Sequence, residues 1–215
     1  PHVERTRNRP LASGELTVRQ ALAAFFVLML LAFGLVLMTN ALTIKLAFAG
    51  AALASSYPFF KRWTHFPQVV LGVAFGWGIP MAFAAETGQE IPAAWLILSI
   101  NVIWSVIYDT LYAMVEREVD ISIGLKSTAI FFGQNDLLVL RLLKVLMVAL
   151  LIWLGFILQL NWPWFVGVAV ASVLFIRQQY EVRDRDRDAC FKAFLNNNWV
   201  GVAIWAGLLA SYLVN

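Results

Sequence analysis

Long apolar runs recur along this chain and predict membrane-spanning helices. Seven runs of roughly 17 to 23 residues lie near residues 19–38, 41–58, 68–85, 93–115, 138–159, 162–178 and 198–214. Each can cross a hydrocarbon core of about 30 Å at a helical rise of about 1.5 Å per residue. The strands of a membrane barrel alternate apolar and polar residues over about ten positions, whereas these runs are longer and apolar on every side. The pattern therefore predicts an all-α, polytopic membrane bundle with seven spans, in a single domain over residues 1–215.

The composition favours the same class of protein. Hydrophobic residues make up 61% of the 215 residues and charged residues only 13%, whereas soluble domains average about 45–50% apolar and about 25% charged residues. This hydropathy disfavours the alternative of a soluble protein with buried helices. Cys190 is the single cysteine, so the chain can form no internal disulfide.

The basic residues predict how the bundle is oriented. Of the sixteen lysines and arginines, only Lys45 falls beside the connections that also carry Glu86 and Glu90. The other fifteen fall in or beside the alternate connections, which the positive-inside rule assigns to the cytoplasm together with the N-terminus. The net charge of +3 is thus an orientation signal, and no basic face with interleaved aromatic residues indicates nucleic-acid binding.

Acidic residues follow one face of the fourth apolar run. Successive helical residues turn by about 100°, so Glu116 and Asp120 each point within about 20° of Asp109, and Tyr112 flanks them. We call Asp109, Glu116 and Asp120 the acidic stripe. Glu118 lies about half a turn away and is a weaker candidate. Carboxylates at this spacing suit Mg²⁺, which usually takes one or two protein carboxylates together with substrate phosphates and water.

Two other interpretations of the stripe stay open at this point. Glu116 and Asp120 alone could mark the solvated end of a helix, but Asp109 lies inside the apolar run, where a carboxylate needs a polar cavity or a partner. Intramembrane acids also occur in the ion relays of transporters, although here they cluster at one end of one span. Arg5, Arg9, Lys61 and Lys126 are predicted on the same membrane face, and basic side chains neutralise a diphosphate well.

The segment from Asp109 to Asp120, with Tyr112-Ala113 and Glu116 between them, resembles the second aspartate-rich motif, DxxYAxxDxxxD, of the UbiA superfamily of intramembrane aromatic prenyltransferases. Residues 57–65, 72–81, 124–129 and 190–198 resemble the bacterial branch of this family that acts on 4-hydroxybenzoate. The resemblance covers essentially the whole chain.

This resemblance implies an Mg²⁺-dependent transfer of a polyprenyl group from polyprenyl diphosphate to the ring of 4-hydroxybenzoate, an early step of ubiquinone biosynthesis in the bacterial inner membrane. It implies metal positions for Glu116 and Asp120 and a catalytic role for Asp109 and Tyr112 in the pocket. It also implies diphosphate contacts for a set of basic and phenolic side chains, namely Arg5, Arg9, Tyr57, Lys61 and Lys126.

The chain departs from the family pattern in two ways. The family's first motif, NDxxDxxxD, would end just before residue 1, so we expect seven spans of a probable nine. Glu116 stands where the pattern has aspartate, which moves the carboxylate by about 1.5 Å, and misplacement by about 1 Å can cost about 10²-fold in rate. An inactive remnant, or an isoprenoid-binding membrane protein without turnover, is therefore the alternative function.

Overall fold

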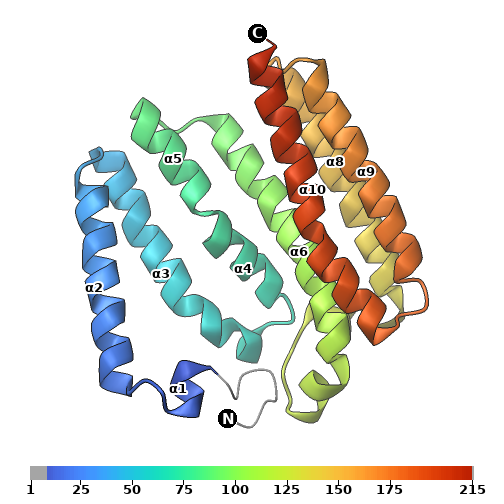
Figure 1. Ribbon diagram of the computed structural model, residues 1–215, viewed down its shortest axis with the longest axis horizontal. Helices are drawn as coiled ribbons and strands as arrows, with labels where there is room; N and C mark the ends of the chain where they lie inside the picture. The colour runs from blue at the N-terminus through green and yellow to red at the C-terminus, as the bar shows by residue number, and fades with distance from the viewer. Residues whose placement is uncertain (1–8, 215) are drawn as a thin grey trace.

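The computed structural model describes residues 9–214, and within them every regular element is a helix. The elements are α1 (Pro10–Ser13), α2 (Val18–Leu37), α3 (Ala41–Trp63), α4 (Pro67–Gly76), α5 (Gly78–Thr87), α6 (Pro92–Ser122), α7 (Thr128–Phe132), the 3₁₀ turn η1 (Gly133–Asn135), α8 (Asp136–Ile157), α9 (Trp162–Glu181) and α10 (Arg187–Leu213). With α4 and α5 joined end to end, the long helices form seven rods side by side (Figure 1). The predicted all-α bundle is confirmed.

Four of these rods satisfy the length and apolarity of a membrane span within the described residues, namely Val18–Leu37, Pro67–Thr87, Pro92–Ser122 and Thr128–Ile157. The rods α3, α9 and α10 complete the predicted seven but carry more polar side chains. On α10, for example, the polar Asn197 is buried, and its Oδ1 accepts a hydrogen bond from Trp104 Nε1 on α6 at 3.2 Å. Asn197 therefore faces the bundle and lowers the mean hydropathy of α10 although it is buried.

The helix α6 lies at the centre of the bundle, where it packs against α4, α5, α7, α8 and α10 (Figure 1). Its contact with α4 is close because Gly72 has no side chain: a Cβ there would lie 2.9 Å from both Val102 Cα and Ser105 Cβ. The amide of Asn101 donates to the Gly72 carbonyl oxygen at 3.0 Å across the same contact. This close packing against α4 holds α6, the helix that carries the acidic stripe, in place.

The third rod is broken, whereas the sequence predicted one continuous span over residues 68–85. Helix α4 ends at Gly76 and α5 begins at Gly78. Pro80 explains the break, since it has no N–H to donate to the carbonyl of Gly76. The Trp77 indole at the junction donates to the Leu46 carbonyl oxygen on α3 at 2.7 Å.

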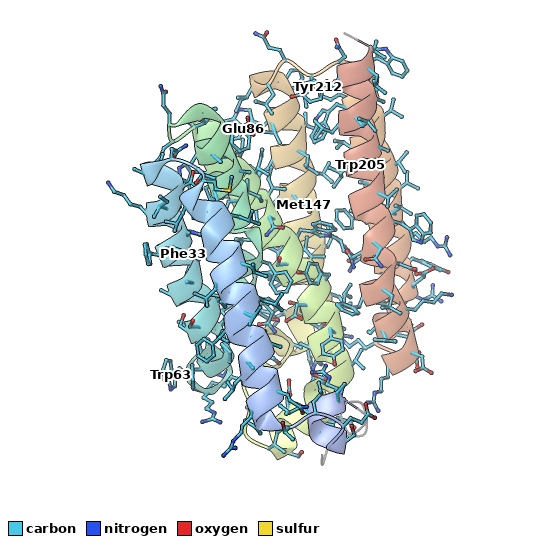
Figure 2. All side chains as sticks on the ribbon, turned by 60° about the vertical axis from the view of Figure 1, so that its left-hand side comes forward. Phe33, Trp63, Glu86, Met147, Trp205 and Tyr212 are labelled. Carbon is cyan, nitrogen blue, oxygen red and sulfur yellow. The ribbon has the colours of Figure 1, made fainter. Side chains whose placement is uncertain are left out.

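The two ends of the bundle carry different charges. The ends of α3, α6 and α9 and the starts of α8 and α10 meet at one end, together with Arg62, Lys126 and Arg187. Glu86 lies at the opposite end, as Figure 2 shows relative to Trp63. The helices therefore gather the basic connections at one end, which we call the basic end.

Candidate active site at the basic end of α6

The length of α6 decides where the acidic stripe lies. Its 31 residues span about 46 Å at about 1.5 Å per residue, which exceeds a hydrocarbon core of about 30 Å. A span that starts at Pro92 leaves that core about twenty residues later. Asp109 then lies in the last turn inside the apolar layer, and Glu116 and Asp120 lie beyond it at the basic end.

The stripe residues are held in place by contacts along and beside α6. Tyr112 donates its hydroxyl to Glu116 Oε1 at 2.6 Å, one turn further along the helix. Asp109 is half-buried and lies near Tyr57 of α3 and Tyr108 of α6. Asp120 is buried. The structure thus gathers Tyr57, Tyr112 and the acidic stripe along the side of α6 that the sequence predicted.

Aromatic side chains from α6 and α10 close the same region. The ring of Phe194 lies 5.1 Å from that of Tyr112 and 6.1 Å from that of Tyr108. Trp104 packs edge-on against Tyr108 at 6.0 Å and is itself fixed by its bond to Asn197. These rings form an apolar wall directly inside the carboxylates, on the side toward the membrane interior.

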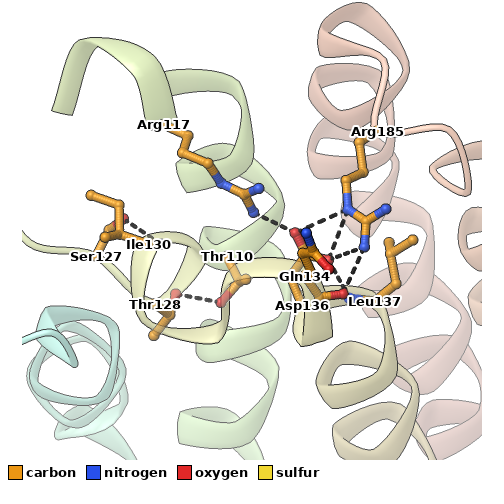
Figure 3. A network of polar contacts seen from close by, with 9 residues as sticks. All are labelled: Thr110, Arg117, Ser127, Thr128, Ile130, Gln134, Asp136, Leu137 and Arg185. Carbon is orange, nitrogen blue, oxygen red and sulfur yellow. Dashed lines mark hydrogen bonds and ion pairs between the residues drawn. The ribbon is translucent and has the colours of Figure 1, made fainter. Parts of the chain in front are cut away.

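The connection from α6 to α7 brings Lys126 back toward α3. Gly124 has a φ of 70°, a left-handed conformation that favours glycine, and starts the turn. The turn is anchored by Thr110 and Thr128, whose hydroxyl oxygens lie 2.7 Å apart (Figure 3). Lys126 Nζ then donates to the Trp63 carbonyl oxygen at the end of α3 at 3.4 Å.

The other basic residues predicted to bind the diphosphate differ in how far the structure describes them. Arg5 lies outside the described residues, as does the side chain of Lys61, although the backbone places Lys61 on α3 one turn after Tyr57. Arg9 is the exposed N-cap residue of α1, and no hydrogen bond or ion pair within residues 9–214 joins it to the stripe. Glu118 is exposed, which is consistent with its being a weaker candidate than the acidic-stripe residues.

Sequence reasoning missed an ionic cluster next to the stripe. Asp136 begins α8, has no exposed side-chain area, and pairs with both Arg117 of α6 and Arg185 before α10 (Figure 3). Arg185 reaches Asp136 Oδ1 with Nη2 at 2.9 Å and also donates to the Gln134 carbonyl oxygen at 2.8 Å. The sequence offered no signal for this pairing, because an aspartate at the first turn of a helix is also an ordinary partner of the helix dipole.

The donor set fits a magnesium ion that is shared with a ligand. Within the described part of the chain, no group of three or more His, Cys, Asp or Glu side chains is close enough to hold a metal alone. Glu116 and Asp120 provide two carboxylates one turn apart. That is the number of protein ligands Mg²⁺ commonly takes when phosphate oxygens and water complete its octahedron.

Fold and site together define a polytopic helical membrane protein with a carboxylate-lined, aromatic-walled site at one membrane face. The chain belongs to the UbiA prenyltransferase family, whose model matches residues 1–208. It is 54% identical over 208 residues to a 4-hydroxybenzoate octaprenyltransferase of Alkalilimnicola ehrlichii, covering 97% of this chain and 71% of that protein. It is 52% identical over 211 residues to the protein of the same name from Psychromonas ingrahamii, covering 98% and 74%.

Solved structures show the same fold. The apo structure of a UbiA homologue from Aeropyrum pernix K1 superimposes with a TM-score of 0.80 at 23% identity, over 97% of this chain and 78% of that one. A digeranylgeranylglyceryl phosphate synthase structure gives a TM-score of 0.73 at 19% identity, over 97% and 76%. These structures confirm the fold, the family model and the relatives confirm the predicted family, and the roles of the individual site residues stay predictions.

Proposed function

We propose that this chain is one transmembrane prenyltransferase domain that transfers a polyprenyl group from polyprenyl diphosphate to the ring of 4-hydroxybenzoate, a step of ubiquinone synthesis. The observation that carries the proposal is the acidic stripe of α6, set at the basic end between an apolar wall and Lys126. The names of the relatives support the choice of acceptor. By the positive-inside rule the site faces the cytoplasm, and the membrane is the bacterial inner membrane.

The substrates' chemistry suits this layout. A polyprenyl chain partitions into lipid at about 0.8 kcal/mol per buried methylene, while its diphosphate must stay in a polar environment. The site offers both, because the aromatic wall faces the membrane interior and the carboxylates face the end of the bundle. The enzyme can therefore bind the allylic carbon at the boundary without removing either part of the substrate from its preferred surroundings.

Glu116 and Asp120 would hold Mg²⁺, which when bound neutralises charge on the departing diphosphate. Tyr112 orients Glu116 through the 2.6 Å hydrogen bond and fixes which carboxylate oxygen is left for the metal. The basic and phenolic side chains predicted to bind the diphosphate directly are Arg5, Arg9, Tyr57, Lys61 and Lys126.

The remaining residues act on the acceptor and on the developing cation. Asp109 accepts a hydrogen bond from the 4-hydroxybenzoate hydroxyl and so raises electron density on the ring carbon that attacks. The ring faces of Tyr108 and Trp104 would stabilise positive charge on the allylic carbon, and both side chains exclude water that would hydrolyse it. The allylic C–O bond to the diphosphate breaks, and the new C–C bond forms at the ring carbon beside the hydroxyl. That carbon then loses its proton to the released diphosphate or to water, which restores the aromatic ring.

Charge removal from the stripe tests this assignment. We expect Glu116→Gln and Asp120→Asn in the full-length protein to lower kcat/KM for prenyl transfer by about 10²-fold or more, the usual effect of removing one preorganised charge contact. Glu118→Gln is the matched control, since Glu118 is exposed on the same helix, and should stay within about twofold of the parent. Equal activity of all three variants would contradict the proposed site.

A further inference from the structure

A second feature of the bundle, a groove between α8 and α9, is separate from the acidic stripe. It has a volume of about 540 Å³ and is lined by Arg141, Lys144, Val148, Phe175, Ile176 and Arg183, among others. None of the stripe residues, nor Tyr57 or Lys126, lines it. Its size falls within the range of about 300–1,000 Å³ that is typical of ligand sites.

Lys144 lies in this groove without a counter-charge. Only 4% of its surface is exposed, and its single hydrogen bond goes from Nζ to Gln179 Oε1 at 3.1 Å. The amide of Gln179 is itself tied to the Leu137 carbonyl oxygen at 2.9 Å, which holds its oxygen toward the lysine. Within residues 9–214 no carboxylate pairs with Lys144, although a buried ammonium normally requires a partner.

Two arginines extend this positive charge toward the basic end. Arg141 lies one turn before Lys144 on α8 and is exposed. The Arg183 guanidinium stacks over the Tyr180 ring at 4.2 Å, and its Nε pairs with the exposed Asp184 at 3.2 Å, an interaction of small free energy in water. The residues that line the groove include three cations and no acid.

The groove also has an apolar part, lined by Val145, Val148, Phe175 and Ile176. Val145 on α8 and Ile176 on α9 both line the groove, and both are exposed. Lys144 is eight residues from the start of α8, about 12 Å along the axis. A ligand that suits this groove therefore needs an anionic head near the membrane surface and a hydrocarbon part that lies along the two helices.

We propose that the groove between α8 and α9 binds an anionic phospholipid, with its phosphate at Lys144, Arg141 and Arg183 and an acyl chain along Val145, Val148 and Ile176. Basic pockets between membrane helices on the cytoplasmic side bind such head groups, with about 1 kcal/mol from each lysine or arginine near the surface. The lipid phosphate supplies the counter-charge that Lys144 otherwise lacks. A soluble anion would leave the exposed apolar lining without a partner.

Native mass spectrometry of the full-length protein tests this proposal. The delipidated protein in a non-ionic detergent is titrated with phosphatidylglycerol or with phosphatidylcholine of the same acyl chains. We expect at least tenfold tighter binding of phosphatidylglycerol. Lys144→Gln should weaken phosphatidylglycerol binding by about five- to tenfold, the equivalent of one lysine contact. Lys192→Gln is the control, because Lys192 is exposed at the same end on α10 and does not line the groove.

The outcomes separate the proposal from its alternatives. Equal binding of both lipids, or equal losses in Lys144→Gln and Lys192→Gln, would overturn it, because the attraction would then be unspecific. Displacement of phosphatidylglycerol by 10 mM inorganic phosphate would overturn the assignment to a lipid and indicate a free anion. If Lys144→Gln fails to fold, Arg141→Gln replaces it, since Arg141 is exposed, and an unchanged affinity in that variant would overturn the proposal.

Discussion

The Asp136 cluster should contribute strongly to stability, and Asp136→Asn tests its contribution. Asp136 is fully buried, whereas the side chains of Arg117 and Arg185 are 25% and 39% exposed. Breaking a fully buried ion pair costs about 3–5 kcal/mol. Because both arginines can regain some hydration, we expect a smaller loss of about 2–3 kcal/mol in the free energy of unfolding.

This loss should be visible in thermal unfolding of the full-length protein in detergent. For a chain of this size, about 2–4 °C of Tm corresponds to each kcal/mol, so Asp136→Asn should lower Tm by about 5–10 °C. Asp184→Asn is the matched control, because Asp184 forms an exposed pair with Arg183 and such pairs contribute about 0–1 kcal/mol. A Tm for Asp136→Asn within about 2 °C of the parent would refute the inference that this cluster holds α6, α8 and the α9–α10 turn together.

Two further predictions concern packing and the site. Gly207→Ala should destabilise the protein by about 1–3 kcal/mol in chemical denaturation, because the added Cβ would lie 2.9 Å from Gly167 Cα between α9 and α10. Gly34→Ala is the control and should not destabilise the protein, because no atom lies within 4 Å of a Cβ added there. Equal stability of the two variants would contradict the packing argument. Tyr112→Phe removes the hydrogen bond to Glu116. It should raise the Mg²⁺ concentration for half-maximal transfer by about three- to tenfold, which corresponds to the net value of a typical hydrogen bond. An unchanged Mg²⁺ requirement would count against Glu116 as a metal residue.

Much of the fold could be predicted from the sequence because hydrophobic length and helical period are local properties. The stripe on α6 is such a case, since the 100° turn per residue alone places Asp109, Glu116 and Asp120 on one face. The break at Trp77 was not predicted, although Pro80, which lacks a backbone donor, offered a signal for it. Hydropathy does not reveal this break, since α4 and α5 both belong to one apolar run.

Contacts between distant segments were beyond that kind of reasoning. The Thr110–Thr128 hydrogen bond and the Asp136 cluster depend on how α6 packs against α7 and α8, which no periodicity encodes. The groove at Lys144 likewise depends on how two helices, α8 and α9, pack against each other. In sequence Lys144 was one basic residue near a connection predicted to be cytoplasmic. Only the packing of α8 on α9 shows that it is buried, with no carboxylate partner among the described residues.

The most direct test of the proposed activity is product formation by the full-length protein. The purified protein is placed in vesicles with Mg²⁺, a polyprenyl diphosphate and ring-deuterated 4-hydroxybenzoate, and the extracted lipid is analysed by mass spectrometry. The account predicts a 3-polyprenyl-4-hydroxybenzoate that has lost one ring deuteron, with no product when Mg²⁺ is chelated. Folded protein that binds the polyprenyl diphosphate but forms no such product would contradict the account and favour an isoprenoid-binding protein without turnover.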